Sequence, residues 1–191
     1  MFDARWLINL KKSYKQKNIS RQHIISASAP LGHSAKKIIF ALQRGENQKK
    51  PIQKIFLDFS KLIKKYKQDR LLREPSFRAA LEEYIEAIFF SAIINKQKIS
   101  PLSSIEVDAD LYLGALSDVT GELVRKVTNM ISEGNYLEAK RLITAGQIII
   151  DELLDFDMTG NLRTKYDQAR NNLRKLEQLN YEISRNKNQE K

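Results

Sequence analysis

The sequence predicts an all-α protein that folds as a single helical-bundle domain over residues 1–191. Only 4 prolines and 7 glycines interrupt the 191 residues, so few positions can end a helix. No stretch alternates apolar and polar residues for long enough to indicate a β-strand. Apolar residues recur instead at spacings of three and four, which places them along one face of a helix. The clearest such stripe consists of Ile52, Ile55, Phe56, Phe59, Leu62, Ile63 and Tyr66.

Helix-breaking residues divide the chain into about seven helices. The Ala29–Gly32 segment, which contains Pro30, predicts a break between a first basic helix and a second helix over about residues 34–44. Gly134 suits the C-terminal cap of a long helix, and Pro101 lies in a predicted loop. The stripe described above marks the third helix. The remaining helices are predicted over about residues 75–95, 108–132, 135–157 and 161–184, followed by a frayed tail over 185–191.

Positive charge is concentrated in the first part of the chain. Residues 1–75 contain 18 Lys and Arg against 5 Asp and Glu, whereas residues 76–191 contain 15 against 18. A polyanion such as nucleic acid is the simplest partner for this field, because every neutralised phosphate releases condensed counterions. Lysine-rich faces that only confer solubility, or an anionic membrane surface, are alternatives that composition leaves open.

The chain has no cysteine, which favours a reducing, cytoplasmic location and excludes thiolate chemistry. The longest strongly apolar run, residues 87–94, is far shorter than the roughly 20 residues that a membrane span requires. We therefore expect a soluble cytoplasmic protein without a membrane span.

Two pairs of carboxylates occur at helical spacing on two predicted helices. Glu83 and Glu86 are three residues apart, which places them roughly 60° apart around a helix axis. Asp118 and Glu122 are four residues apart on the next long helix. Carboxylate oxygens without histidine suit a hard cation, Mg²⁺ or alternatively Mn²⁺. Acidic pairs are also common on solvated helix faces, so the spacing alone leaves both interpretations open.

Several segments resemble the translin superfamily, and most closely its catalytic branch, translin-associated factor X (TRAX). The segment Gly114–Arg125, with Asp-Val-Thr-Gly-Glu-Leu at its centre, resembles the TRAX signature Asp-Leu-Thr-Gly-Glu-Leu. Glu83-Tyr-Ile-Glu-Ala87 is similar to the Glu-Tyr-x-Glu-Ala motif of the preceding TRAX helix. Weaker similarity extends over residues 36–44 and 162–167, so the resemblance covers about residues 34–185. The short loop between the acidic helices and the Pro30 region depart from the family pattern.

The resemblance implies a translin-like fold of seven helices and a hollow homo-oligomer of the prokaryotic type. It also implies magnesium-dependent cleavage of single-stranded RNA inside that assembly. Carried over by position, Glu83, Glu86 and Asp118 match the catalytic acids of the family, and they would bind the metal together with Glu122.

Basic and aromatic residues of the first helices are the candidate nucleic-acid contacts. We expect Lys36, Lys37, Lys11 and Lys12 to contact phosphates. Trp6 is expected to anchor the N-terminal helix to the bundle or to a neighbouring subunit, with base stacking as the alternative. Two other functions remain open. One is a non-catalytic protein of the translin type that binds single-stranded RNA or DNA, and the other is a scaffold that uses the apolar side of residues 90–94 for protein contacts.

Overall fold

The computed structural model describes residues 2–102 and 105–189, and these form seven α-helices without a β-strand. The predicted all-α class is therefore confirmed. The helices are α1 (Ala4–Gln43), α2 (Lys49–Lys65), α3 (Gln68–Leu72), α4 (Pro75–Ile94), α5 (Ala109–Ser132), α6 (Tyr136–Leu154) and α7 (Gly160–Gln189). None of the described helices is long and apolar enough to cross a membrane.

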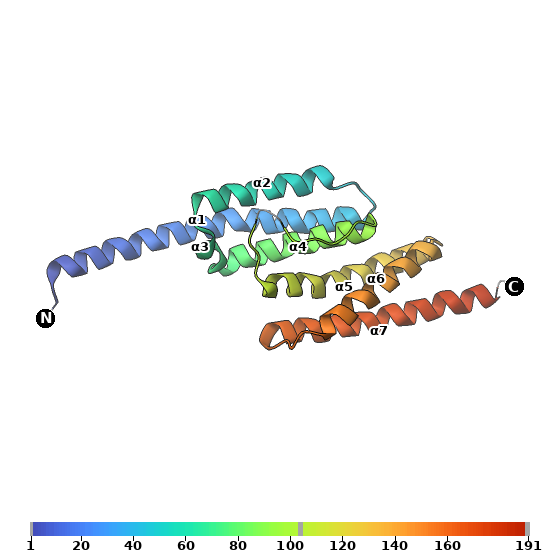
Figure 1. The fold of residues 1–191 in the computed structure, drawn as a ribbon. Coiled ribbons are helices and arrows are strands. Elements are labelled where there is room, and N and C mark those ends of the chain that lie inside the picture. The colour runs from blue at the N-terminus through green and yellow to red at the C-terminus, as the bar shows by residue number, and fades with distance from the viewer. Residues whose placement is uncertain (1, 103–104, 190–191) are drawn as a thin grey trace.

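Helix α4 lies in the middle of the bundle. It packs against α1 and α5, while α2 covers the other side of the α1–α4 pair and α6 and α7 pack on α5 (Figure 1). Phe59 of α2 contacts the rings of Phe77 and Tyr84 of α4 at centroid distances of 5.6 and 5.3 Å, and all three side chains are buried. Helix α4 has neighbours on several sides, and apolar residues lie nearly all around its axis. An acidic residue on α4 therefore lies close to the core.

The predicted break at Pro30 is wrong, because α1 continues through this residue. Proline removes one backbone donor, but the helix that follows it buries Ala35, Ile38 and Ile39, mostly against α4. Gly32 lies at this contact, and a Cβ at its position would be 3.4 Å from Ala80, an ordinary van der Waals distance. Tertiary packing here outweighs the local preference for a break.

Two further boundaries differ from the prediction. The five-residue helix α3 was not predicted, and together with the merging of the first two helices it keeps the number of described helices at seven. The tail predicted to fray from Arg185 is helical as far as Gln189, and residues 190 and 191 lie outside the described residues. No proline or glycine occurs between Arg185 and Gln189, so nothing in the sequence ends α7 there.

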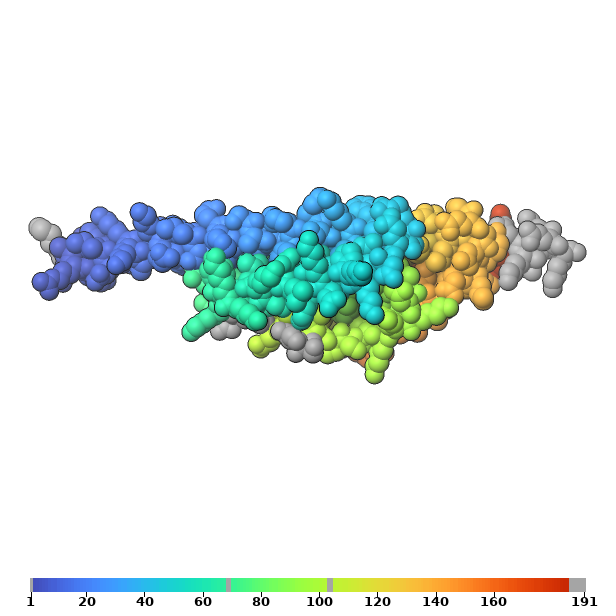
Figure 2. Space-filling view, turned by 90° about the horizontal axis from the view of Figure 1, so that it is seen from above, coloured from blue at the N-terminus to red at the C-terminus, as the bar shows by residue number. Residues whose placement is uncertain are grey.

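The N-terminal part of α1 extends beyond the rest of the bundle. Figures 1 and 2 show this segment, in dark blue, projecting past α2 and α3. Ile24 is the first buried residue of α1, and the Trp6 side chain is 52% exposed. Trp6 is thus not anchored to the bundle of its own chain, contrary to one of the two predicted possibilities.

The apolar side proposed for protein contacts by a scaffold is not available. Phe90 and Ile93 are buried inside the chain, where α5 and α6 cover α4. This observation removes the main support for the scaffold hypothesis.

Candidate functional site

Four acidic side chains from α4 and α5 line a single pocket. Glu83, Glu86, Asp118 and Glu122 surround a cavity of about 340 Å³, whose remaining wall is formed by Lys36, Ile39 and Phe40 of α1. The two acidic pairs therefore face each other across the α4–α5 interface, and neither forms an ordinary solvated helix face. The pocket opens where α1 crosses this interface, so three helices determine its shape.

Glu86 is the most deeply placed of the four acids. Only 9% of its surface is exposed, because it lies between apolar residues of α4 that pack on neighbouring helices. Burial, together with the negative charges of Asp118, Glu83 and Glu122, raises the pKa of Glu86 from 4.5 to about 8, while Lys165 opposes the rise. At neutral pH and without a cation, Glu86 consequently keeps its proton. The four carboxyl groups of the pocket are therefore not all ionised at neutral pH.

Two lysines from distant helices neutralise part of this charge. Lys36 Nζ lies 3.1 Å from Glu83 Oε1. Lys165 Nζ of α7 lies 2.5 Å from Asp118 Oδ2 and 2.9 Å from Glu82 Oε1. The charge pattern of the sequence did not indicate Lys165, because it is 47 positions away from Asp118.

Glu122 is held by an amide and, more loosely, by an arginine. Gln43 Nε2 donates to Glu122 Oε2 at 2.7 Å and to the Glu122 backbone oxygen at 2.9 Å. Arg125 Nη1 lies 3.5 Å from Glu122 Oε2, and its guanidinium also lies 5.0 Å from the centre of the Phe40 ring. Arg125 thus lies beside Glu122, but the buried Gln43, which sequence reasoning missed, makes the closer contact.

The residue types of the pocket fit a hard divalent cation. All four candidate ligands offer carboxylate oxygens, and the protonated Glu86 shows that further positive charge would be accommodated. Among the residues that the structure describes, no group of three acidic or histidine side chains is already arranged to hold a metal ion. The ion pairs of Lys36 with Glu83 and of Lys165 with Asp118 give a physical reason, since both carboxylates point to an ammonium group. Cation binding would require Glu83 to leave Lys36, and it would use the oxygen of Asp118 that Lys165 does not contact.

Comparison with known proteins decides the family. The model of the translin family matches residues 20–185 of this chain. The chain belongs to the translin family. This translin-family protein is also 26% identical over 183 residues to the uncharacterized protein MJ0175 of Methanocaldococcus jannaschii, a match that covers 92% of this chain and 80% of the relative. The predicted superfamily is thereby confirmed.

Solved structures share the fold. The crystal structure of AfC3PO superposes with a TM-score of 0.84 at 21% identity, covering 93% of this chain and 96% of the other. The complex of AfC3PO with duplex RNA gives a TM-score of 0.81 at 19% identity with the same coverage. The structure of apo-NeC3PO gives 0.78 at 25% identity and covers 95% of this chain and 97% of the other. The predicted translin-like fold of seven helices is confirmed.

The four lysines predicted to contact phosphates occupy different places on the translin-family fold. Lys36 lies in the acidic pocket, whereas the neighbouring Lys37 lines a separate surface pocket between α1 and α2. Lys11 and Lys12 are exposed on the projecting part of α1, which at 1.5 Å per residue lies roughly 40 Å along the helix from Lys36. Of these four lysines, only Lys36 lies beside the carboxylates of the pocket.

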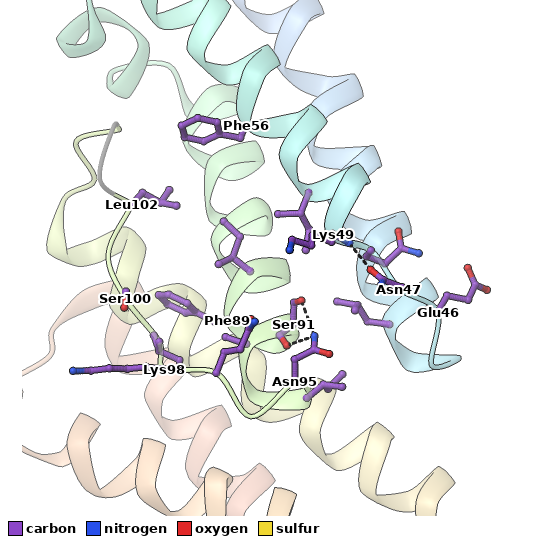
Figure 3. Close-up of a pocket in the computed structure, with 18 of the residues that line it drawn as sticks. Glu46, Asn47, Lys49, Phe56, Phe89, Ser91, Asn95, Lys98, Ser100 and Leu102 are labelled. Atoms are coloured by element: carbon purple, nitrogen blue, oxygen red, sulfur yellow. Dashed lines mark hydrogen bonds between the residues drawn. The ribbon is translucent and has the colours of Figure 1, made fainter.

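A larger cavity is distinct from the acidic pocket. It measures about 700 Å³ and lies between the start of α2, the end of α4 and the loop that follows α4 (Figure 3). Apolar side chains such as Phe56, Phe89 and Leu102 form much of its wall, and Glu46 is the one carboxylate among its lining residues. A lone carboxylate cannot provide the several oxygen ligands of a hard cation. The smaller pocket is therefore the candidate site.

Proposed function

We propose that this protein is a divalent-metal-dependent ribonuclease of the TRAX type, which cleaves single-stranded RNA within a homo-oligomer. The observation that carries the proposal is the meeting of four carboxylates in one pocket, where burial and mutual repulsion leave Glu86 protonated. Acids of this kind are characteristic of functional sites, because a fold without a use for them would replace them with apolar residues. The similarity of the two acidic segments to TRAX motifs supports the same assignment.

Glu83, Glu86, Asp118 and Glu122 are the residues that would hold Mg²⁺ or Mn²⁺. A bound divalent cation would supply the positive charge that stabilises a phosphodiester group under attack. The deep position of Glu86 lets it hold a proton at its carboxyl group when no cation compensates the other acids.

The chain offers groups for RNA next to the acids. The Lys36 side chain is 57% exposed, so its ammonium group can reach a phosphate at the mouth of the pocket. Phe40 is half exposed beside Arg125 and provides a flat surface on which an unpaired base can stack. The basic first part of the chain adds attraction for the strand without base preference. The AfC3PO complex shows that a protein of the same fold binds duplex RNA, and single-stranded DNA is a second ligand to test here.

Cleavage of a labelled single-stranded RNA tests the proposal. The wild type is expected to cleave with Mg²⁺ or Mn²⁺ and to stop with excess chelator. Glu83→Ala and Asp118→Ala should each lower the rate by about 100-fold or more while retaining the helical content. Glu177→Ala, at an exposed position of α7, is the matched control and should cleave as the wild type does. Undiminished cleavage by both pocket variants would refute the assignment.

A second candidate function is non-catalytic binding of single-stranded RNA or DNA. This function is favoured because three of the acids already have protein partners. Lys36 pairs with Glu83, Lys165 pairs with Asp118, and Gln43 donates a hydrogen bond to Glu122. In that case the acids would only orient these side chains. Salt-dependent binding of an oligonucleotide without cleavage, under either added metal, would decide for this alternative.

A further inference from the structure

Lys165 connects the acidic pocket to a carboxylate outside it. Its ammonium group lies between Glu82 of α4 and Asp118 of α5, at 2.9 and 2.5 Å, so one residue of α7 joins three helices. The Lys165 side chain is only 21% exposed. Burial lowers the pKa of Lys165, but the hydrogen bonds and charges of Asp118 and Glu82 outweigh it and raise the pKa. The group remains a fixed positive charge.

Glu82 and Glu83 are neighbours in sequence but have different roles in this arrangement. Successive residues of a helix point about 100° apart, and Glu83 lines the pocket whereas Glu82 does not. Glu82 is therefore not among the side chains that line the pocket, and it accepts a hydrogen bond from Lys165 instead. This geometry suits an anchor for the lysine.

Gly114 provides an independent sign that the Glu82–Lys165 contact is built into the fold. It lies one helical turn before Asp118, on the same side of α5. A Cβ at Gly114 would lie 1.9 Å from Glu82 Oε1 and 3.6 Å from Lys165 Nζ. Glycine in the middle of a helix costs about 1 kcal/mol relative to alanine. The missing side chain leaves room for the ion pair of Glu82 with Lys165, and this ion pair offsets the cost.

We propose that Lys165 is a positioning residue for the metal-dependent reaction. Held by Glu82, it fixes Oδ2 of Asp118 and leaves Oδ1 free for the cation. The inference rests on the proposed function, because it gives Asp118 a cation to bind. Lys165 also offsets one negative charge beside the pocket, so it has two separable effects: it orients Asp118, and it weakens the attraction of the pocket for a cation.

The two effects predict a result that a structural role would not give. Replacing Lys165 by methionine removes a positive charge near the cation, so Mn²⁺ should bind more tightly, by about 3- to 10-fold. The freed Asp118 rotates, so kcat should fall by about 10-fold or more with little change in KM. A residue that only holds the helices together would lower both metal affinity and activity as the pocket loosens.

The experiment compares the full-length wild type with Lys165→Met, Lys165→Arg and Gly114→Ala. Mn²⁺ affinity is measured by electron paramagnetic resonance, cleavage by kcat and KM, and folding by thermal unfolding. Lys165→Arg keeps the charge and should restore most of kcat and the wild-type affinity. Gly114→Ala displaces Glu82 and should shift both quantities in the direction of Lys165→Met, but less. Lys175→Met, at an exposed position of the same helix, should match the wild type.

The outcomes separate the two proposals. Wild type that binds Mn²⁺ and cleaves, together with folded Lys165→Met that either keeps the wild-type kcat or binds Mn²⁺ more weakly, overturns the positioning role alone. If Lys165→Met does not fold, the same criterion applies to Gly114→Ala. Wild type that neither binds Mn²⁺ nor cleaves overturns the proposed function and this inference with it.

Discussion

Replacement of Glu86 by glutamine should stabilise the protein when no metal is present. Glutamine has nearly the same shape as a protonated glutamate but cannot ionise. Between pH 4.5 and about 8 the folded protein keeps the Glu86 proton, whereas the unfolded chain has lost it. The folded state thus binds more protons in this window, and wild-type stability falls as pH rises through it.

The size of the effect follows from the shift in pKa. Each pKa unit corresponds to 1.36 kcal/mol, so the rise from 4.5 to about 8 is worth about 5 kcal/mol above pH 8. At pH 7 the wild type has lost about 3 kcal/mol of this amount, and at pH 5 less than about 1 kcal/mol. Glu86→Gln should therefore exceed the wild type in free energy of unfolding by about 3 kcal/mol at pH 7, and the two should nearly coincide at pH 5.

Urea denaturation with excess chelator, at one protein concentration and at pH 5, 7 and 9, measures this difference. Glu177→Gln, on an exposed face of α7, controls for the removal of an ordinary carboxylate. Parallel stability curves for the wild type and Glu86→Gln across this pH range would show that Glu86 ionises normally. The account of an overcharged pocket would then be wrong.

Two further predictions concern the stability of the helices. Asp108 accepts a hydrogen bond from Leu111 N at 3.0 Å as the N-cap of α5 and pairs with Arg78, so Asp108→Ala should cost about 1 to 2 kcal/mol at pH 7 by urea denaturation. Burial opposes ionisation of Asp108, but these bonds lower its pKa below 3.8. The charge-dependent part of its contribution is therefore present above pH 3.8 and should decrease as pH falls through the lowered pKa; an unchanged loss there would contradict the linkage. A Cβ at Gly146 would lie 2.5 Å from Cδ1 of the buried Leu176, so Gly146→Ala should lower Tm despite the better helix propensity of alanine, whereas Gly121→Ala, whose nearest neighbour would be 3.5 Å away, should not. Equal changes in Tm for both glycine variants would contradict the packing argument.

The helices were predictable because their signal is local and repeated. Apolar residues recur at spacings of three and four along the helices that form the bundle, and the structure buries these residues between neighbouring helices. The error at Pro30 has a different cause, since local chemistry predicts a break there and only the contacts of α1 with α4 keep the helix continuous. Helix α3 has five residues, too few for a helical period to be recognised.

The site was predictable only where one helix carries several of its residues. Glu83 with Glu86, and Asp118 with Glu122, have spacings that place each pair on one side of a helix. The partners of these acids come from helices far away in sequence, and Gln43 is 79 positions from Glu122. No spacing rule connects such residues, because their proximity is created by the packing of α1 and α7 on α4 and α5.

The two lysines that pair with acids of the pocket, Lys36 and Lys165, differ in how easily they can change partners. Lys36 is 57% exposed and, among the side chains that the structure describes, forms an ion pair only with Glu83; an exposed ion pair of this kind contributes about 1 kcal/mol or less. It can therefore leave Glu83 for a phosphate of a bound strand at little cost. Lys165 is 21% exposed and serves two carboxylates, so its departure would leave both unpaired near the core. Under the proposed function, arrival of a strand at Lys36 would free Glu83 for a cation while Lys165 keeps Asp118 in place, and the acidic pocket would then accept a polyanionic substrate and a metal together.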